Sequence, residues 1–168
     1  FNFNRCFLGP YYPVPIFICC RNLLNAISYN SENTVINPTT SFALFSSSVV
    51  QTVVPSGNVV TSFIAGSGTG ITSDGAGNIT LAPGTYRISY NAFGTFPANG
   101  TLSLALYQDG FIVPSSQSST SGTTGNIGAL LNVSTVTVTG ASSIIRLVNT
   151  NTQSQTINSA SIVITKIG

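Results

Sequence analysis

The residue types that most often carry catalysis and metal binding are scarce in this sequence. The chain has no His, which removes the commonest general base and metal ligand. Its carboxylates are Glu32, Asp74 and Asp109, each more than thirty residues from the next. Asp74 precedes Gly75, but one carboxylate cannot supply the roughly six to eight oxygens that Ca²⁺ takes. The sequence therefore predicts no catalytic residue, no metal site and no cofactor, and a protein that is not an enzyme.

The three cysteines, Cys6, Cys19 and Cys20, are the remaining candidates for chemistry. A nucleophilic thiolate needs a neighbouring base or cation, and only Arg5 and Arg21 are near in sequence. A disulfide between the adjacent Cys19 and Cys20 would strain the peptide, and an odd number of cysteines indicates a bond to another chain or a free thiol. We expect inter-subunit disulfides at these positions, with buried free thiols as the alternative.

Glycine spacing gives no stronger indication of a binding site. Gly66-x-Gly-x-Gly70 is loosely similar to a phosphate-binding loop, but no Lys and no helical pattern follow it. We expect loops both there and in the Ser/Thr/Gly-rich run 115–125.

Composition indicates a surface that other copies of the chain cover. The 168 residues are 42% hydrophobic and only 5% charged, far below the usual quarter. A net charge of +2 without a basic cluster argues against a nucleic-acid partner. No apolar run reaches the roughly 18 residues of a membrane span. The sequence thus predicts self-association, with no nucleic acid and no membrane as partner.

Residues 1–38 differ in composition from the rest, because they hold all the cysteines and many aromatic and proline residues. The prolines favour extended backbone over helix. We interpret this segment as an extended docking arm; the alternative is an edge strand packed on its own domain. The residues expected to dock are Phe1, Phe3, Asn4, Phe7, Leu8, Gly9, Pro10, Tyr11, Tyr12, Pro13, Pro15 and Phe17.

Residues 39–168 are expected to form an all-β head domain, because short apolar runs alternate with turn residues. Asp109-Gly110 is the strongest hairpin signal. The expected strands are 42–46, 49–54, 59–64, 79–81, 85–93, 101–108, 111–113, 127–138, 144–149 and 159–167.

The strand that begins at Gly84 has one face suited to a core, because Tyr86, Ile88 and Tyr90 alternate with polar residues. Its Gly-x-Tyr opening resembles the signature strand of the tumour necrosis factor and complement globular-head superfamily. That resemblance implies a jelly-roll sandwich that forms trimers. The last strand, 160–167, is apolar on both faces, which suggests a subunit interface on one of them. We expect Tyr86, Tyr90, Ile162 and Ile164 to line that interface.

The start of the chain carries a second resemblance. Phe1-x-x-Asn4, followed by Leu8-Gly-Pro10-x-x-Pro13, is similar to the leader of the collagen-like glycoproteins of the bacterial exosporium. The last strand is similar to that of their heads, in which Ala-Ser-Ile precedes aliphatic residues and a Lys. In that family the leader is trimmed just before its Phe, in agreement with a chain that starts at Phe1. The present chain departs from the family in the insertion 5–7, in Val14-Pro15 and in lacking a collagen-like stalk.

Two functions follow from these resemblances. The first is a structural subunit of a spore-surface fibre or exosporium layer, in which trimers are linked head to tail by their arms. The second is a trimeric binding or adhesion head, displayed on the spore and anchored by its leader to other exosporium proteins. A third interpretation, a phage-tail or capsid protein with a jelly-roll fold, leaves the resemblance of residues 1–13 to the leader unexplained.

Overall fold

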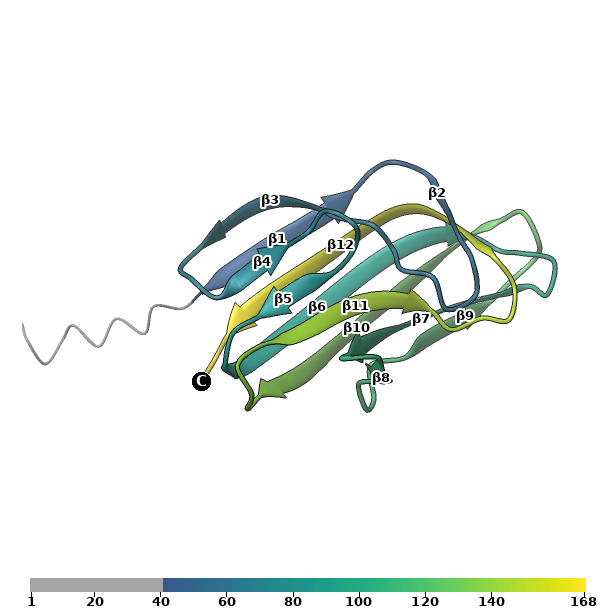
Figure 1. Ribbon diagram of the computed structural model, residues 1–168. Helices are drawn as coiled ribbons and strands as arrows, with labels where there is room; N and C mark the ends of the chain where they lie inside the picture. The colour runs from purple at the N-terminus through teal and green to yellow at the C-terminus, as the bar shows by residue number, and fades with distance from the viewer. Residues whose placement is uncertain (1–40) are drawn as a thin grey trace, which may run out of the picture. The chain divides into compact units, whose positions relative to one another are not determined.

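The structure, a computed structural model, describes residues 41–168, and regular structure in this part of the chain is entirely β (Figure 1). The strands are β1 (Phe42–Ser47), β2 (Gln51–Val53), β3 (Ser62–Ser67), β4 (Ile71–Ser73), β5 (Ile79–Leu81), β6 (Gly84–Thr95), β7 (Thr101–Gln108), β8 (Phe111–Ile112), β9 (Ser118–Ser121), β10 (Ile127–Val138), β11 (Ser143–Asn149) and β12 (Gln155–Lys166).

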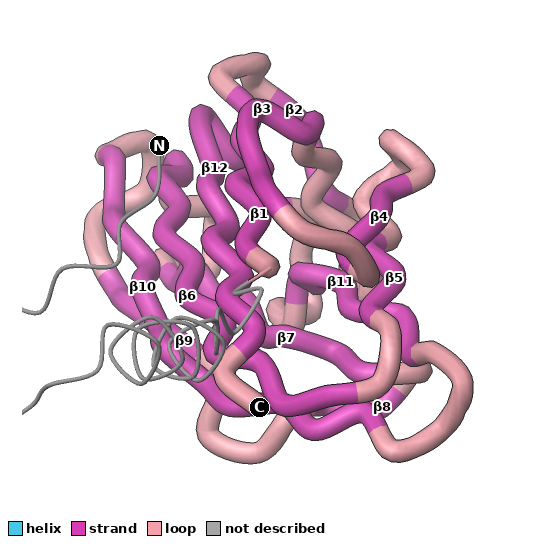
Figure 2. Tube along the Cα trace, turned by 90° about the vertical axis from the view of Figure 1, so that its left-hand side faces the viewer, coloured by secondary structure: helices cyan, strands magenta, loops and turns pink. Residues whose placement is uncertain are grey.

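The strands form two six-stranded sheets in which every pairing is antiparallel. The first sheet has the order β10-β6-β12-β1-β3, with β2 paired to β12. The second has the order β4-β5-β11-β7-β8, with β9 paired to β7. Figure 2 shows β10, β6, β12 and β1 of the first sheet side by side, with β11, β5 and β4 of the second sheet to their right. This is the all-β jelly-roll sandwich that the sequence predicts.

The core lies between the two sheets. Side chains alternate in direction along each strand, so every second residue points into the core. On β6, Tyr86, Ile88, Tyr90 and Ala92 are buried, whereas Arg87 and its outward neighbours are not. The apolar side chains that meet them from the second sheet are Ile79, Leu81, Leu102, Leu104, Leu106, Ile145 and Leu147.

The expected hairpin at Asp109-Gly110 is confirmed. Tyr107 pairs with Ile112 and Gln108 with Phe111 across the two turn residues. Asp109 and Gly110 have φ values of 50° and 90°. Positive φ at both central positions defines a type I′ turn, whose twist matches that of antiparallel strands.

The expectation of a loop over residues 115–125 is wrong in part, because Ser118–Ser121 forms β9 on the edge of β7. Ser116 anchors the segment: its Oγ accepts from the Leu106 N–H (3.1 Å) and donates to the Leu106 carbonyl (3.1 Å). At Gly122 a Cβ atom would collide with the Phe96 ring, so this glycine makes room for a core aromatic. Free hydrogen-bonding groups on β7 thus order a sequence of low strand propensity.

The third strand is shifted along the chain from the expected 59–64 to Ser62–Ser67. Val59 is instead fully buried, and its N–H donates to the Leu147 carbonyl (2.8 Å). The Gln51 side chain holds the next residue, because it both donates to and accepts from the Val60 main chain (3.0 and 2.8 Å). Consequently Gly66 lies in a strand rather than in a loop.

The predictions for the docking arm, for Cys6, Cys19 and Cys20, and for the domain boundary near residue 38 lie outside the described residues. They stay predictions.

Candidate self-association surface

The outward side of the first sheet is a surface of short polar and exposed apolar side chains. We call it the outer face. Its central members, which alternate with core residues along each strand, are Phe42, Leu44 and Ser46 on β1, Arg87, Ser89, Asn91 and Phe93 on β6, Ala129, Leu131, Val133 and Thr135 on β10, and Ser159, Ser161, Val163 and Thr165 on β12.

Strand register arranges these side chains in rows across the sheet. One row runs from Leu131 through Asn91 to Ser161, and the next from Val133 through Ser89 to Val163. Directly opposed side chains on neighbouring strands are the closest cross-strand neighbours. Each row therefore places exposed aliphatic groups beside short hydroxyl or amide groups.

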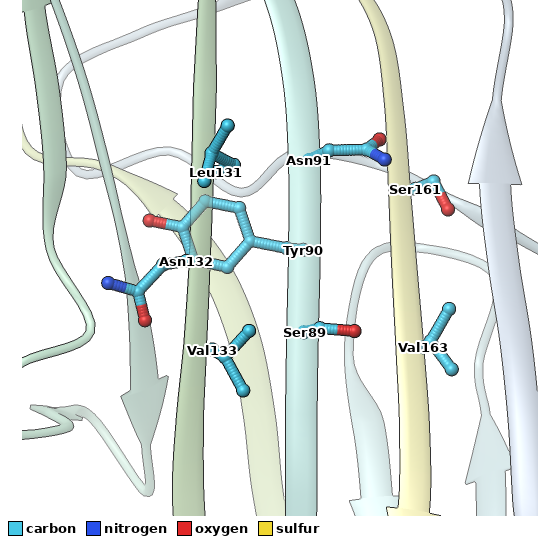
Figure 3. A pocket seen from close by; sticks show the side chains of 8 residues that line it. All are labelled: Ser89, Tyr90, Asn91, Leu131, Asn132, Val133, Ser161 and Val163. Carbon is cyan, nitrogen blue, oxygen red and sulfur yellow. The ribbon is translucent and has the colours of Figure 1, made fainter.

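These two rows border a hollow of about 250 Å³. Figure 3 shows the two rows crossing three strands, with Leu131 above Val133 on β10 and Ser161 above Val163 on β12. The hollow exists because Ser89 and Asn91, which lie between the aliphatic residues, have shorter side chains than a fully packed face would need. A protruding apolar side chain of a partner would fit this shape.

The outer face carries very little charge. The charged side chains of residues 41–168 are Asp74, Arg87, Asp109, Arg146 and Lys166. Of these, only Arg87 belongs to the rows of the outer face, where it lies between Thr135 and Thr165. Burying this face against a second copy would therefore require the desolvation of one charged group per subunit.

Large apolar side chains on this face are exposed in the subunit taken alone. The exposed fractions are 70% for Leu131, 54% for Val133 and 38% for Val163. Phe93 and Phe42 are also exposed. Large apolar side chains gathered on one face of a sheet are typical of an interaction surface.

The four residues predicted to line the subunit interface lie inside the subunit instead. Tyr86, Tyr90, Ile162 and Ile164 are at most 3% exposed. They point between the sheets, because the inward side of β6 and β12 must cover the apolar face of the second sheet. The assignment of these four side chains to the interface is thus corrected: they form the subunit core, and the opposite side of β12, which carries Val163, is the one that faces outward.

The hydroxyl groups of Tyr86 and Tyr90 are both hydrogen-bonded within the subunit. The Tyr86 hydroxyl donates to the Ala82 carbonyl (2.9 Å). The Tyr90 hydroxyl lies within hydrogen-bond distance of the Leu104 and Ser116 carbonyls (3.0 and 2.8 Å), and burial raises the pKa of both phenols above the ordinary value. Neither group is placed to react with a ligand at the surface.

Leu131 and Val133, two exposed aliphatic residues of the outer face, were not singled out from the sequence. A signal for them was present, because Leu130 and Leu131 are adjacent and one of any adjacent pair in a strand must point away from the core. Sequence alone did not say which of the two does so. The structure distinguishes the two residues, because Leu130 is buried in the core and Leu131 is exposed.

Both carboxylates of the described part accept hydrogen bonds within the subunit, Asp74 inside its own loop and Asp109 from the start of β11. The Ser143 hydroxyl (2.6 Å) and the Ile144 N–H (2.8 Å) donate to Asp109 and hold the pKa of that carboxyl below its usual range. The Asn78 side-chain amide and the Ala76 N–H lower the pKa of Asp74 in the same way. Within residues 41–168, no group of three or more His, Cys, Asp or Glu side chains could hold a metal ion.

Several solved structures are similar to this fold. Eiger TNF from S. frugiperda aligns with a TM-score of 0.64 and 13% identity, over 77% of this chain and 94% of that one. The globular domain of zebrafish complement 1qA aligns with a TM-score of 0.62 and 10% identity, over 76% and 98%. Murine APRIL aligns with a TM-score of 0.61 and 10% identity, over 76% and 99%.

The fold is that of the TNF and complement heads. At these identities the likeness shows the fold alone. Neither a family model nor a curated protein matches the sequence. Along the part of the chain that the structure describes, no helix is long and apolar enough to cross a membrane.

Proposed function

We propose that this protein is a self-assembling structural subunit whose heads associate as trimers through the outer face. The observation that carries this proposal is the exposure of Leu131, Val133 and Val163 on a sheet face with one charged side chain. Burying each of these aliphatic groups would contribute roughly 1.5–3 kcal/mol. Trimers, rather than another oligomer, are what the resemblance to the globular-head superfamily implies.

The proposed place of the protein is the bacterial spore surface, as a subunit of an appendage fibre or of the exosporium. Support comes from the leader-like residues Phe1 to Pro13 and from the last strand, both similar to exosporium glycoproteins. The arm, residues 1–38, would dock on a neighbouring trimer. A head-to-tail contact of this kind does not close on itself and therefore generates a filament.

The outer face is tested by placing a charge on it. Leu131→Lys introduces an ammonium group that a trimer interface would have to desolvate, so sedimentation velocity is expected to show monomers. Phe111→Lys is the matched control, because Phe111 is 78% exposed and lies on β8 of the second sheet. Trimers in both variants would reject the outer face as the interface.

Removal of the first part of the arm separates a fibre subunit from a displayed head. Deletion of residues 1–20 is expected to leave trimers intact and to abolish fibres in negative-stain micrographs, because the core of residues 41–168 closes without them. Discrete trimers from the complete chain would favour the display function. Fibres of normal length from the truncated chain would show that the arm is not the linker.

A further inference from the structure

The free edge of β3 is an unprotected strand edge. β3 pairs with β1 on one side and with no described strand on the other. All six of its residues are exposed, with Phe63 at 57% and Ile64 at 59%. Natural edge strands are protected by charges, prolines or coverage. The sequence Ser-Phe-Ile-Ala-Gly-Ser of β3 contains neither a charge nor a proline.

The edge is also held in shape before anything binds to it. The Phe63 ring packs edge-on against the buried Phe45 ring, with centroids 5.8 Å apart and planes at 69°. At Gly66 a Cβ atom would lie 2.6 Å from the Phe42 carbonyl oxygen and 2.9 Å from Phe63 Cε2, so only glycine lets the ring lie there. Glycine in a strand permits close approach of another backbone. The edge thus combines fixed geometry with open main-chain groups.

Residues 1–40 connect to the head domain through Ser41, which lies near the end of β3 on the side that pairs with β1. Ser41, the first described residue, donates through Oγ to the Thr69 carbonyl (2.8 Å), just beyond the end of β3. Phe42 pairs with Ser67, the last residue of β3. Forty residues precede Ser41.

Only one stretch of those forty residues has the composition of a strand of useful length. Ile16-Phe-Ile-Cys-Cys20 is uncharged and rich in β-branched and aromatic residues. Pro10, Pro13 and Pro15 exclude the residues before it from the centre of a sheet. Val35-Ile36 is shorter, and it is too close to Ser41 in the sequence to extend far from its own head domain. By contrast, the twenty residues between Cys20 and Ser41 can span about 65–70 Å when extended.

We infer that Ile16–Cys20 of a second copy adds to the free edge of β3 as a further strand of the first sheet. Main-chain hydrogen bonds to the edge provide the affinity, as in other cases of strand addition. The inference rests on the proposed function, since it names the site on the neighbouring head that receives the arm. It also brings Cys19 and Cys20 against an outer edge of the partner.

Disulfide trapping between two different chains tests this contact. One full-length chain carries Ser62→Cys together with Cys6→Ser, Cys19→Ser and Cys20→Ser, and a differently tagged second chain is wild type. A disulfide between position 62 of the first chain and Cys19 or Cys20 of the second is then necessarily intermolecular. Ser62 is an exposed residue of β3, and Phe111→Cys in the same background is the matched control on the second sheet.

Co-expressed chains are expected to give at least about tenfold more of this cross-linked product at position 62 than at position 111, because docking raises the local thiol concentration. Ile64→Lys in the first chain is expected to abolish the product, and Ile64→Lys in every copy is expected to shorten or remove fibres, whereas Phe111→Lys leaves both unchanged. Equal cross-linking at the two positions, or a disulfide formed only within one chain when Ser62→Cys is placed in the wild-type background, would overturn the inference.

Different results would overturn the β3 site and the fibre function. Normal fibres in Ile64→Lys, with no cross-link at position 62, would overturn the β3 site and leave the fibre function standing. A wild-type chain that never assembles beyond the trimer would overturn the fibre function, and this inference with it.

Discussion

The Tyr90 hydroxyl on β6 reaches across the sandwich to the carbonyl oxygen of Leu104 on β7, at 3.0 Å. It also lies 2.8 Å from the Ser116 carbonyl, in the segment that leads into β9. One phenol therefore connects the first sheet, the second sheet and a surface segment. Because it is buried, neither carbonyl can turn to water if the hydroxyl is removed.

Tyr90→Phe is accordingly expected to destabilise the fold by about 1–2 kcal/mol, the range for leaving a buried polar partner unsatisfied. Chemical denaturation at fixed protein concentration measures this change. Tyr107→Phe is the control: Tyr107 is partly exposed on β7, and its change should stay within about 0.5 kcal/mol. Equal effects in the two variants would show that the hydrogen bonds of Tyr90 add no stability.

Gly84→Ala is expected to destabilise by about 1–3 kcal/mol, the usual cost of a side chain in strained backbone. Gly84 has a φ of 146°, and its Cβ would collide with Lys166 Cε and lie 2.7 Å from the Gly168 carbonyl oxygen. The Gly168 carbonyl cannot move away freely, because it accepts from the Thr85 N–H (2.6 Å). Gly140→Ala is the control, since nothing lies within 4 Å of a Cβ there. Thermal unfolding compares the two, and an unchanged Tm in Gly84→Ala would contradict the steric argument.

Stability is expected to be flat from neutral pH to about pH 5 and to fall only below about pH 4. Hydrogen bonds lower the pKa of Asp109 and of Asp74 in the folded state. A carboxyl with a depressed folded pKa stabilises the fold above its unfolded pKa, near 3.9, and loses that contribution as pH falls through the folded value. With no His in the chain, no loss is expected near pH 6. Thermal unfolding from pH 8 to pH 2 gives the profile; a drop between pH 7 and pH 5 would refute it.

The acid-induced drop is further expected to be smaller in Asp109→Asn. The replacement removes the titrating group while its amide oxygen still accepts from the Ile144 N–H. A profile identical to that of the wild type would show that Asp109 does not contribute to the drop.

Cys6, Cys19 and Cys20 are expected to link subunits covalently once the protein is in an oxidising environment. Fibres boiled in detergent should then run as oligomers without reductant and as monomers with it. Replacing all three residues by Ser should remove the oligomers and lower the resistance of fibres to heat. Monomers from unreduced wild-type fibres would instead indicate free thiols.

The sequence by itself determined the class of structure and much of its local form. Alternation along 84–95 fixed which side chains of β6 share a face, because successive residues of a strand must point in opposite directions. Asp109-Gly110 specified a hairpin, because few other residue pairs adopt positive φ twice in succession. Scarcity of charge predicts that another copy covers some of the surface, and the absence of His and the separation of the carboxylates predict a protein without catalysis; both stay predictions.

Only the tertiary structure decided which face of each strand packs in the core and which face points outward. Ile162 and Val163 are both aliphatic, and nothing local distinguishes the side of β12 that packs on the second sheet from the side that faces outward. That choice depends on register with β6, whose inward tyrosines find carbonyl partners at Ala82 and, on the second sheet, Leu104. Likewise β9 exists because β7 offers it a hydrogen-bonding edge, and the open edge of β3 exists because no described strand pairs there. Pairings between distant segments are long-range interactions, so no window of neighbouring residues contains them.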